Sequence, residues 1–396
     1  MFEEFQKIDL IRRIFPEQEL ETFLSQHYAK QPYLGRSRLG DQDERDQLLS
    51  IAEIDRLVNS VEIPPRTIDM ANAERRMYRD EFTYSEGRID ARRVMEHVRN
   101  GSTLILTQLQ ESVESLADVC RDLEAVFNCH VQTNIYLTPP GKQGFKPHFD
   151  GHDVLVFQLK GTKAWTLFSN RYELPFKGER FDSNQHEPGD VVDEFDLNAG
   201  DFLYLPKGVM HQAPNKGDEP SLHITIGLIQ KNWTDLILEA VSEVAINHPE
   251  FRQPLPAGFA RADFDVESVR PTFERLKEIL SSDLEFEGAL DYFAGEFIRN
   301  QKPKTEGRLS NILAAQDLMA ETWCLQENAL AQIETSDEQV LLIAAGGVRK
   351  YPVDFESGLK RVLTGEAFCA QDLNLSKEAC EELIGSLYDA GVIAVN

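Results

Sequence analysis

The spacing of hydrophobic residues changes near residue 130. Before it, hydrophobic side chains recur at helical spacing between Ser112 and Phe127, which predicts an amphipathic helix. After it, short runs alternate with a period of two, and Gly, Pro, Asn and Asp separate them. Several short strands in succession predict a β-sandwich or a β-barrel. The runs are VQTNIYLTPP, KPHFDGHDVLVFQLKG, KAWTLF, DEFDL, DFLYLP and SLHITIGLI.

Two segments outside these runs are less regular. Residues 23–36 predict a helix that gives way to an extended segment at Pro32, and Pro64 and Pro65 exclude a helix at their position. Residues 170–196 are polar, and we expect them to form a long excursion over the barrel.

Helical spacing returns after the strands, and short β-prone pieces reappear near the C-terminus. Helices are expected at 236–246, 269–280 and 284–298, and then near 308–320, 356–363 and 376–389. The β-prone pieces are QVLLIAA and GVIAV. Two helices followed by a terminal strand pair resemble a winged helix.

We therefore predict an α+β protein of three parts. With 396 residues and 41% hydrophobic content, the chain can form two or three domains with buried cores. Residues 1–235 would form the barrel with an N-terminal α/β extension. Residues 236–303 would form a helical region, and residues 304–396 a winged-helix-like domain.

Composition sets the expected compartment. The sequence contains no run of 18 apolar residues, so we expect no membrane span. The first residues mix charged with apolar side chains and lack the apolar core of a signal peptide. The five cysteines are scattered, which argues against a disulfide framework and against a structural zinc site. A cytoplasmic protein is the expectation.

The net charge of −26 bears on the choice of partner. Broad binding to nucleic-acid phosphates needs clustered Lys and Arg, so we do not expect direct nucleic-acid binding. A chain this acidic should attract a basic partner. Solubility alone is an equally open interpretation of the charge.

The first candidate for chemistry is the run Pro147-His148-Phe149-Asp150. On a strand, His148 and Asp150 would point to the same face. An imidazole and a carboxylate side by side are two of the three ligands of a 2-His-1-carboxylate metal site. Taken alone the pattern is weak, since two polar residues at a strand end would look the same.

A second motif supplies the third ligand. The run GDFLYLPKGVMHQAPN from Gly200 to Asn215 matches the second cupin motif in its spacing. Gly200 would turn the chain into a strand, Gly208 would form a second turn, and His211 would begin the next strand and point into the barrel. The two motifs together predict a metal site formed by His148, Asp150 and His211.

These motifs carry a family resemblance. From about Gly101 to Leu228 the chain resembles the JmjC-type ribosomal oxygenases of the cupin superfamily, through NIYLTPPGKQGFKPHFDGHDVLVFQLKGTKAW and LNAGDFLYLPKGVMHQA. Similarity to the N-terminal QPYL segment is weaker, and the helical tail matches only in architecture. The resemblance implies a double-stranded β-helix (jelly-roll) barrel, Fe(II), 2-oxoglutarate as cosubstrate, O₂, and a homodimer formed through the helical region.

The resemblance also implies cosubstrate residues. Lys163 would pair with the distal carboxylate of 2-oxoglutarate, because a lysine in a barrel strand is costly to bury without an anion. A Lys163 that faces solvent is the alternative. Further residues expected to line the cosubstrate pocket are Asn134, Tyr136, His223 and Thr225. His152 is expected to face solvent, with a part in substrate positioning as the alternative.

The implied function is an Fe(II)- and 2-oxoglutarate-dependent hydroxylase that acts on an arginine or histidine side chain of a basic ribosomal protein. The acidic stretch Glu187–Asp196 would border the mouth of the site. Two alternatives stay open: a JmjC-type lysine demethylase, and a non-oxygenase cupin that binds a small molecule.

Overall fold

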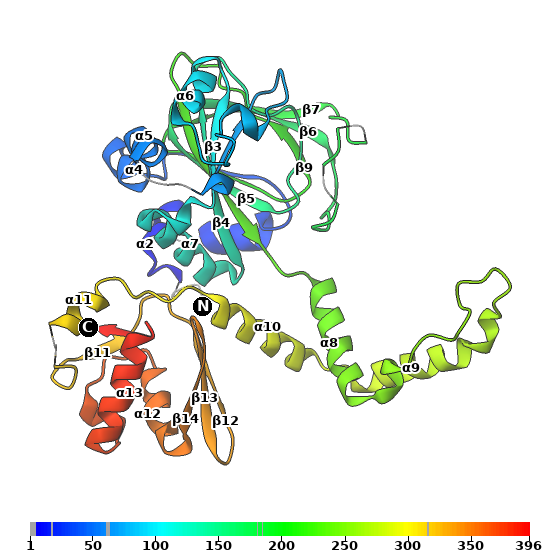
Figure 1. Ribbon diagram of the computed structural model, residues 1–396, viewed down its shortest axis with the longest axis vertical. Coiled ribbons are helices and arrows are strands. Elements are labelled where there is room, and N and C mark those ends of the chain that lie inside the picture. The colour runs from blue at the N-terminus through cyan, green and yellow to red at the C-terminus, as the bar shows by residue number, and fades with distance from the viewer. Residues whose placement is uncertain (1–4, 17–18, 61–63, 180, 184, 315–316) are drawn as a thin grey trace. The chain divides into compact units, whose positions relative to one another are not determined.

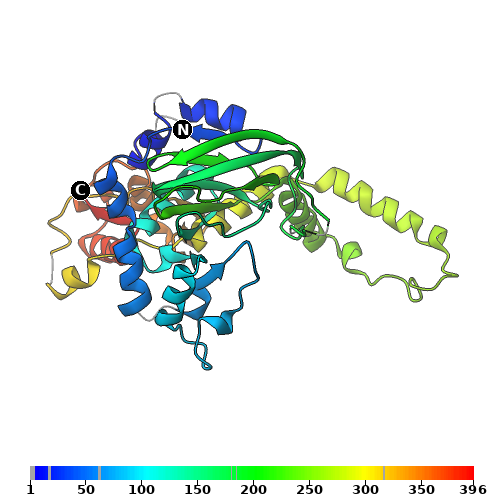
Figure 2. The same ribbon diagram turned by 90° about the horizontal axis from the view of Figure 1, so that it is seen from above.

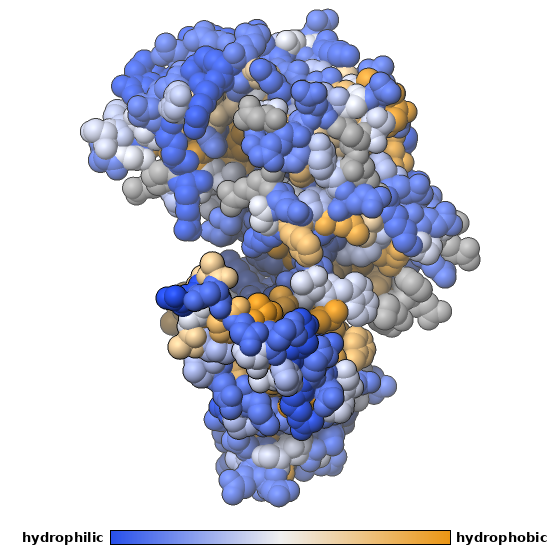
Figure 3. Space-filling model, turned by 90° about the vertical axis from the view of Figure 1, so that its right-hand side faces the viewer, coloured by the Kyte–Doolittle hydropathy of each residue, from blue (hydrophilic) through white to orange (hydrophobic). Residues whose placement is uncertain are grey.

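The computed structural model describes residues 5–16, 19–60, 64–179, 181–183, 185–314 and 317–396. The chain forms two compact units, Met1–Gln230 and Lys231–Asn396. Among the described residues, no helix combines the length and the apolar character needed to cross a membrane. On the face shown in Figure 3 most residues are hydrophilic, and hydrophobic residues, drawn orange, are exposed only in places.

The first unit contains two antiparallel sheets (Figure 1). The large sheet has the strand order β1-β8-β5-β10-β4-β3-β2, and the small sheet has the order β7-β6-β9. The strands are β1 (Tyr33–Gly35), β2 (Ile68–Ala71), β3 (Thr103–Thr107), β4 (His130–Thr138), β5 (Asp153–Lys160), β6 (Thr162–Arg171), β7 (Val191–Asn198), β8 (Phe202–Leu205), β9 (Val209–Gln212) and β10 (Ser221–Ile229). These strands confirm the predicted cupin barrel within an α+β fold.

The helices of the first unit pack beside strands of the large sheet, and Figure 2 shows them from above. They are α2 (Asp9–Ile14), α3 (Glu19–Thr22), α4 (Gln42–Leu48), α5 (Ile51–Ser60), α6 (Ala91–Arg99) and α7 (Glu114–Phe127), with short turns η1 (Phe23–His27), η2 (Pro65–Thr67), η3 (Arg79–Glu81) and η4 (Leu109–Glu111). Helix α7 confirms the predicted amphipathic helix. The expected helix near residue 23 is the single turn η1, and β1 follows it.

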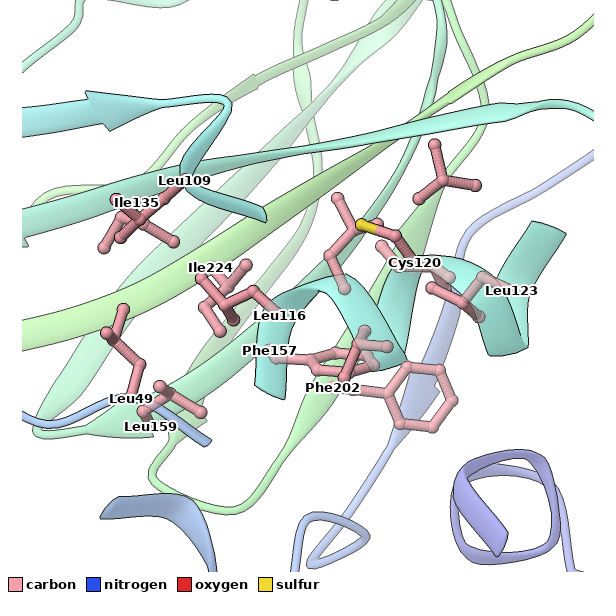
Figure 4. Packing of buried hydrophobic residues seen from close by; sticks show 14 of the residues in the cluster. Leu49, Leu109, Leu116, Cys120, Leu123, Ile135, Phe157, Leu159, Phe202 and Ile224 are labelled. Atoms are coloured by element: carbon pink, nitrogen blue, oxygen red, sulfur yellow. The ribbon is translucent and has the colours of Figure 1, made fainter. Parts of the chain in front are cut away.

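Period-two alternation divides the large sheet into two faces. On β10, Leu222, Ile224, Ile226 and Leu228 pack into the main hydrophobic core. Helix α7 covers this face with Leu116, Cys120 and Leu123 (Figure 4). Each fully buried leucine contributes roughly 1.5–3 kcal/mol to folding. The opposite face of the same strands is left for polar residues.

A smaller hydrophobic cluster lies between the two sheets. It joins Val154 and Val156 of β5 to Trp165 and Leu167 of β6, and further members come from β7, β8 and β9. The predicted excursion between β6 and β7 is shorter than expected. It covers residues 172–190, because the following residues form β7 and pair with β6.

The second unit begins with the three predicted helices, α8 (Trp233–Asn247), α9 (Arg270–Asp283) and α10 (Phe286–Asn300), with turns η5 (Pro249–Arg252) and η6 (Val266–Ser268). It continues with α11 (Arg308–Leu313), β11 (Trp323–Leu325), β12 (Ala331–Thr335), β13 (Gln339–Ala344), β14 (Gly347–Pro352), η7 (Val353–Phe355), α12 (Glu356–Val362), η8 (Ala370–Leu373), α13 (Lys377–Asp389) and β15 (Ile393–Val395). The strands β12, β13 and β14 form one antiparallel sheet, and β11 pairs with β15.

The helix expected near 308–320 was predicted too long. Helix α11 ends at Leu313. The side chain of Asp317 accepts a hydrogen bond from the Met319 N–H at 3.1 Å, a local turn that competes with a continuing helix. The helices predicted at 356–363 and 376–389 are confirmed as α12 and α13.

A buried carboxylate on α7 makes stability depend on pH. Glu124 accepts a hydrogen bond from the Val131 N–H at 3.1 Å, and its side chain is 13% exposed. Burial raises the pKa of Glu124 from 4.5 to about 7, although the Val131 N–H and Arg121 act in the opposite direction. Between these two pKa values the native state binds more protons than the unfolded state. Stability therefore falls as the pH rises through this window.

We predict that Glu124→Gln removes this dependence. The amide keeps an acceptor for the Val131 N–H but cannot ionise. From about pH 4 to about pH 8, the free energy of unfolding of the wild type should fall relative to that of the variant by on the order of 3 kcal/mol. Urea denaturation at a series of pH values measures the difference. A difference that stays constant with pH would show that Glu124 titrates normally.

Candidate functional site

The backbone pairs His148 with His211. The His148 N–H donates to the His211 carbonyl at 3.0 Å, and the His211 N–H donates back to the His148 carbonyl at 2.8 Å. This antiparallel bridge brings the two ring centroids to 4.6 Å from each other. Asp150, the third residue of the predicted metal site, is held by the turn at Gly208. The Gly208 N–H donates to the Asp150 carbonyl at 2.9 Å.

The local structure differs from the predicted strands. His148 forms one isolated bridge, and β5 begins only at Asp153, so Asp150 is not part of a strand. His211 is the third residue of β9 and not its first. Gly208 explains why the ladder stops. Its φ of +80° turns the chain, and a Cβ there would lie 1.7 Å from the Tyr172 carbonyl oxygen.

A buried carboxylate holds this turn in place. Asp153 accepts hydrogen bonds from the Lys207 N–H at 2.9 Å and the Gln230 side chain at 3.0 Å. The hydroxyl of Tyr204 also donates to Asp153. The turn that ends at Gly208 is therefore anchored to the first residue of β5.

Each histidine ring is oriented by a carbonyl two residues before it. His148 Nδ1 lies 2.9 Å from the Lys146 carbonyl oxygen, and His211 Nδ1 lies 2.9 Å from the Val209 carbonyl oxygen. Because a carbonyl only accepts, both Nδ1 atoms carry the proton and both Nε2 atoms keep a free lone pair. His211 Nε2 lies 3.9 Å from Asp150 Oδ2.

The three side chains form a cluster able to hold a metal ion. One ligand atom from each of His148, Asp150 and His211 lies within 4.8 Å of the others. Burial raises the pKa of Asp150, but the neighbouring histidines His148, His211 and His152 outweigh burial and lower it overall. Burial and His148 lower the pKa of His211 to about 4. An ionised carboxylate and neutral imidazoles are the protonation states that bind a metal.

The cluster opens into a cavity in the barrel. All eight residues singled out in the sequence line this cavity: His148, Asp150, His211, Lys163, Asn134, Tyr136, His223 and Thr225. Sequence reasoning did not single out Thr138, Phe145 and Trp165, which also line it. Thr138 has the parity of Asn134 and Tyr136 on β4, so its place could have been predicted. His152, expected to face solvent, lines the cavity as well.

Lys163 lies at one end of the cavity and is only 3% exposed, which excludes the solvent-facing alternative. Its Nζ donates to Thr138 Oγ1 at 3.0 Å and to the Ala213 carbonyl at 3.1 Å. No carboxylate of the described residues forms an ion pair with it. Burial lowers the pKa of Lys163 to about 7.

Two more polar groups near this end are unsatisfied. Within the described chain, His223 Nδ1 and Trp165 Nε1 are buried without a hydrogen-bond partner. The His223 ring stacks on Tyr136 at 4.9 Å, and burial with the nearby Lys163 lowers its pKa well below the usual value. A buried cation without a counter-ion and unpaired polar atoms are costly without a ligand. This end of the cavity therefore fits a small organic anion.

The acidic stretch does not line the cavity. Residues 191–196 of this stretch belong to β7, and none of residues 187–196 is a lining residue. Val191 and residues 193–196 pair with β6 instead. That the stretch borders the mouth of the site stays a prediction.

A comparison with known protein families gives a match over the segment that carries the metal cluster. Residues 106–236 match the family model described as JmjC domain. This segment of the chain is a JmjC domain. The matched residues include the triad, Lys163 and both sequence motifs, and the resemblance predicted from the sequence is confirmed.

Two relatives of this chain have names that include a hydroxylase or an oxygenase. The bifunctional lysine-specific demethylase and histidyl-hydroxylase NO66 of Dictyostelium discoideum is 38% identical over 206 residues, which cover 49% of this chain and 39% of that protein. Ribosomal oxygenase 1 of Gallus gallus is 28% identical over 370 residues, which cover 86% of this chain and 59% of that protein. The chain thus matches less than two thirds of the length of these relatives.

A solved structure shares the fold of this chain. It is the structure of YcfD, a ribosomal oxygenase from Escherichia coli, in complex with cobalt and 2-oxoglutarate. The match has a TM-score of 0.52 and 16% sequence identity, and it covers 95% of this chain and 97% of that chain.

Proposed function

We propose that the protein is an Fe(II)- and 2-oxoglutarate-dependent hydroxylase that acts on an arginine or histidine side chain of a ribosomal protein. One observation carries the proposal: a single cavity holds a His-Asp-His cluster and, at one end, a buried lysine without a counter-ion. The names of the relatives, ribosomal oxygenase and histidyl-hydroxylase, support the substrate class.

Separate residues of the cavity would bind the metal and the cosubstrate. His148, Asp150 and His211 would hold Fe(II), and three protein ligands leave further coordination positions open. When bound, Fe(II), 2-oxoglutarate and O₂ supply the oxidative chemistry that inserts one oxygen atom into a C–H bond, with succinate and CO₂ as by-products. Lys163, held by Thr138, would pair with the distal carboxylate of the cosubstrate.

The remaining predicted residues shape the cosubstrate pocket. Asn134 and Thr225 are paired neighbours on β4 and β10, and Tyr136 pairs with His223 one step further along. These four side chains would orient the cosubstrate between Lys163 and the metal cluster. The strands on which they lie are covered by the main core, which keeps this wall of the cavity closed to water.

A lysine demethylase is the second candidate, because the name of the Dictyostelium relative includes that activity. The two activities differ in mass: hydroxylation adds one oxygen, and demethylation removes a methyl group. A non-oxygenase cupin that binds a small molecule is less well supported, since Asp150 and the unpaired Lys163 have no role in it. Ligand binding that proceeds without O₂ turnover would favour such a cupin.

We further propose that residues 236–303 form a homodimer interface and residues 304–396 a winged-helix-like domain in a cytoplasmic protein. Helix α8 exposes Trp233, Ile237, Leu238 and Ile246, an unusual set for a surface helix. Val244 is buried within its own unit and is not available for the interface.

The first prediction from this proposal concerns the metal. His211→Ala removes one of three ligands, and Fe(II) affinity should fall at least a hundredfold while far-UV circular dichroism stays unchanged. Anaerobic calorimetric titration with Fe(II) measures the affinity, and 2-oxoglutarate turnover should be lost with it. His130→Ala, at a side chain 64% exposed, is the matched control. Wild-type Fe(II) affinity in His211→Ala would refute the triad.

The substitution Lys163→Met tests whether Lys163 binds the distal carboxylate of 2-oxoglutarate. The variant keeps an unbranched side chain one atom shorter and removes the charge-assisted hydrogen bond, so the Kd for 2-oxoglutarate should rise roughly tenfold to a hundredfold. Titration of the Mn(II)-loaded protein with 2-oxoglutarate measures this Kd without turnover. Lys160→Met, at a lysine that does not line the cavity, serves as the control. An unchanged Kd would place the distal carboxylate elsewhere.

The substrate class is tested with unmodified ribosomal proteins. Incubation with the enzyme, Fe(II), 2-oxoglutarate and O₂ should add a single oxygen to one arginine or histidine of one basic protein, as located by tandem mass spectrometry. If 2-oxoglutarate is consumed and no ribosomal protein gains mass, the substrate class is wrong while the iron chemistry stands.

The charge of −26 gives this reaction an expected salt dependence. Attraction of a cationic protein speeds its encounter with an acidic enzyme. The kcat/KM for the ribosomal protein should therefore fall as added salt shortens the Debye length from about 10 Å to about 3 Å. A rate that does not respond to salt would remove the electrostatic part of the argument.

The dimer proposal has its own test. Leu238→Asp combined with Ile246→Asp places two charges on the exposed face of α8 and should convert a dimer into a monomer, as measured by light scattering at micromolar concentration. Val348→Asp, at an exposed position of β14, is the control. A wild-type monomer at this concentration would contradict the proposal.

A further inference from the structure

Strand β10 contributes His223 and Thr225 to the lining of the cavity, and Gly227 follows on the same face of the strand without lining the cavity itself. His223, Thr225 and Gly227 share one face of this strand, because side chains alternate along it. His223 lies at the end near Lys163, whose charge acts on it. Four residue steps along a strand span about 13 Å, so Gly227 marks a position far from the cosubstrate end.

The absent side chain of Gly227 makes room for His152. A Cβ built on Gly227 would lie 2.6 Å from His152 Nε2 and 2.8 Å from its Cδ2. No other residue type fits beneath the ring without moving it. Gly227 pairs with Gln132 on β4 and Val154 on β5, so both neighbouring strands fix its position. The His152 ring is thus seated in a cradle in the sheet.

His152 offers polar atoms that the protein does not use. Its side chain lines the cavity beside Asp150 and makes no hydrogen bond with the described residues. Phe145 lines the same cavity, is 43% exposed, and has its ring centroid 5.5 Å from that of His148. A polar ring and an exposed flat ring near the metal cluster fit a planar side chain that carries N–H groups.

We propose that His152, seated over Gly227, positions the target side chain by accepting a hydrogen bond from its guanidinium or imidazole N–H. A five-carbon diacid anchored at Lys163 uses the other end of the cavity, which leaves the part lined by His152 to a second ligand. The inference rests on the proposed function, since it assigns the substrate end of the same site. His152 acts as a positioning residue and not as a metal ligand.

A double-mutant cycle between His152 and Gly227 tests the proposal in the full-length enzyme. His152→Leu removes the acceptor. Gly227→Ala keeps the histidine but displaces its ring, which is the movable end of a side chain. The assay measures KM and kcat for the ribosomal protein that the wild type hydroxylates. His152→Gln retains an acceptor, and His130→Leu is the exposed control.

Four results are expected. His152→Leu and Gly227→Ala should each raise the KM for the protein substrate about tenfold, as the loss of one hydrogen bond implies. In the double variant, Gly227→Ala should add nothing further, because the ring that it displaces is gone. His152→Gln should restore part of the affinity. The Kd for 2-oxoglutarate on the Mn(II)-loaded protein, which needs no turnover, should stay unchanged in every variant.

Other results would overturn the assignment. An unchanged KM in His152→Leu, or additive effects in the double variant, would show that His152 does not contact substrate from its cradle. A raised Kd for 2-oxoglutarate would assign His152 to the cosubstrate. In these cases the proposed function survives, because the wild type still hydroxylates its substrate. If the wild type consumes 2-oxoglutarate but modifies no ribosomal protein, the proposed substrate class fails and this inference fails with it.

Discussion

The two backbone hydrogen bonds between His148 and His211 are the constraint on which the rest of the site depends. In an antiparallel pair that exchanges both bonds, the Cα atoms are held about 5.5 Å apart. Each ring then donates from Nδ1 to the carbonyl two residues before it, at 2.9 Å in both cases. Because the same Nδ1–carbonyl hydrogen bond orients both rings, their two Nε2 atoms point toward one position. Asp150 reaches that point because the turn at Gly208 binds its carbonyl.

This arrangement is costly to fold. Lys163 is buried without a counter-ion, and His223 and Trp165 each keep a buried polar atom without a partner in the described chain. Each such group costs on the order of 1–3 kcal/mol or more. The alternation of the strands offsets the cost. One face of β4, β5 and β10 is almost wholly hydrophobic and lies against α7, and its burial offsets the cost of the unsatisfied polar groups that β6 and β10 present to the cavity.

The sequence predicted the residues of the site better than their local structure. The spacing of two motifs identified the triad, and parity on β4 and β10 placed Asn134, Tyr136 and Thr225 in one cavity. Parity failed for His148 and Asp150, which are not in a strand, because the ladder ends at the left-handed turn of Gly208, a long-range effect. His152 was expected in solvent since nothing local shows that Gly227, 75 residues later, leaves space for its ring.

The net charge of the chain and the charge of Lys163 in the cavity have opposite signs, and the two do not conflict. The net charge of −26 acts through water, where screening limits its reach to about 8–10 Å. The charge of Lys163 acts inside the barrel, where burial removes most of that screening. An acidic surface can therefore attract a basic protein while the cavity binds a small dianion. The two ligands need not compete, because several residues of β10 separate His223, near Lys163, from Gly227, against which the His152 ring lies.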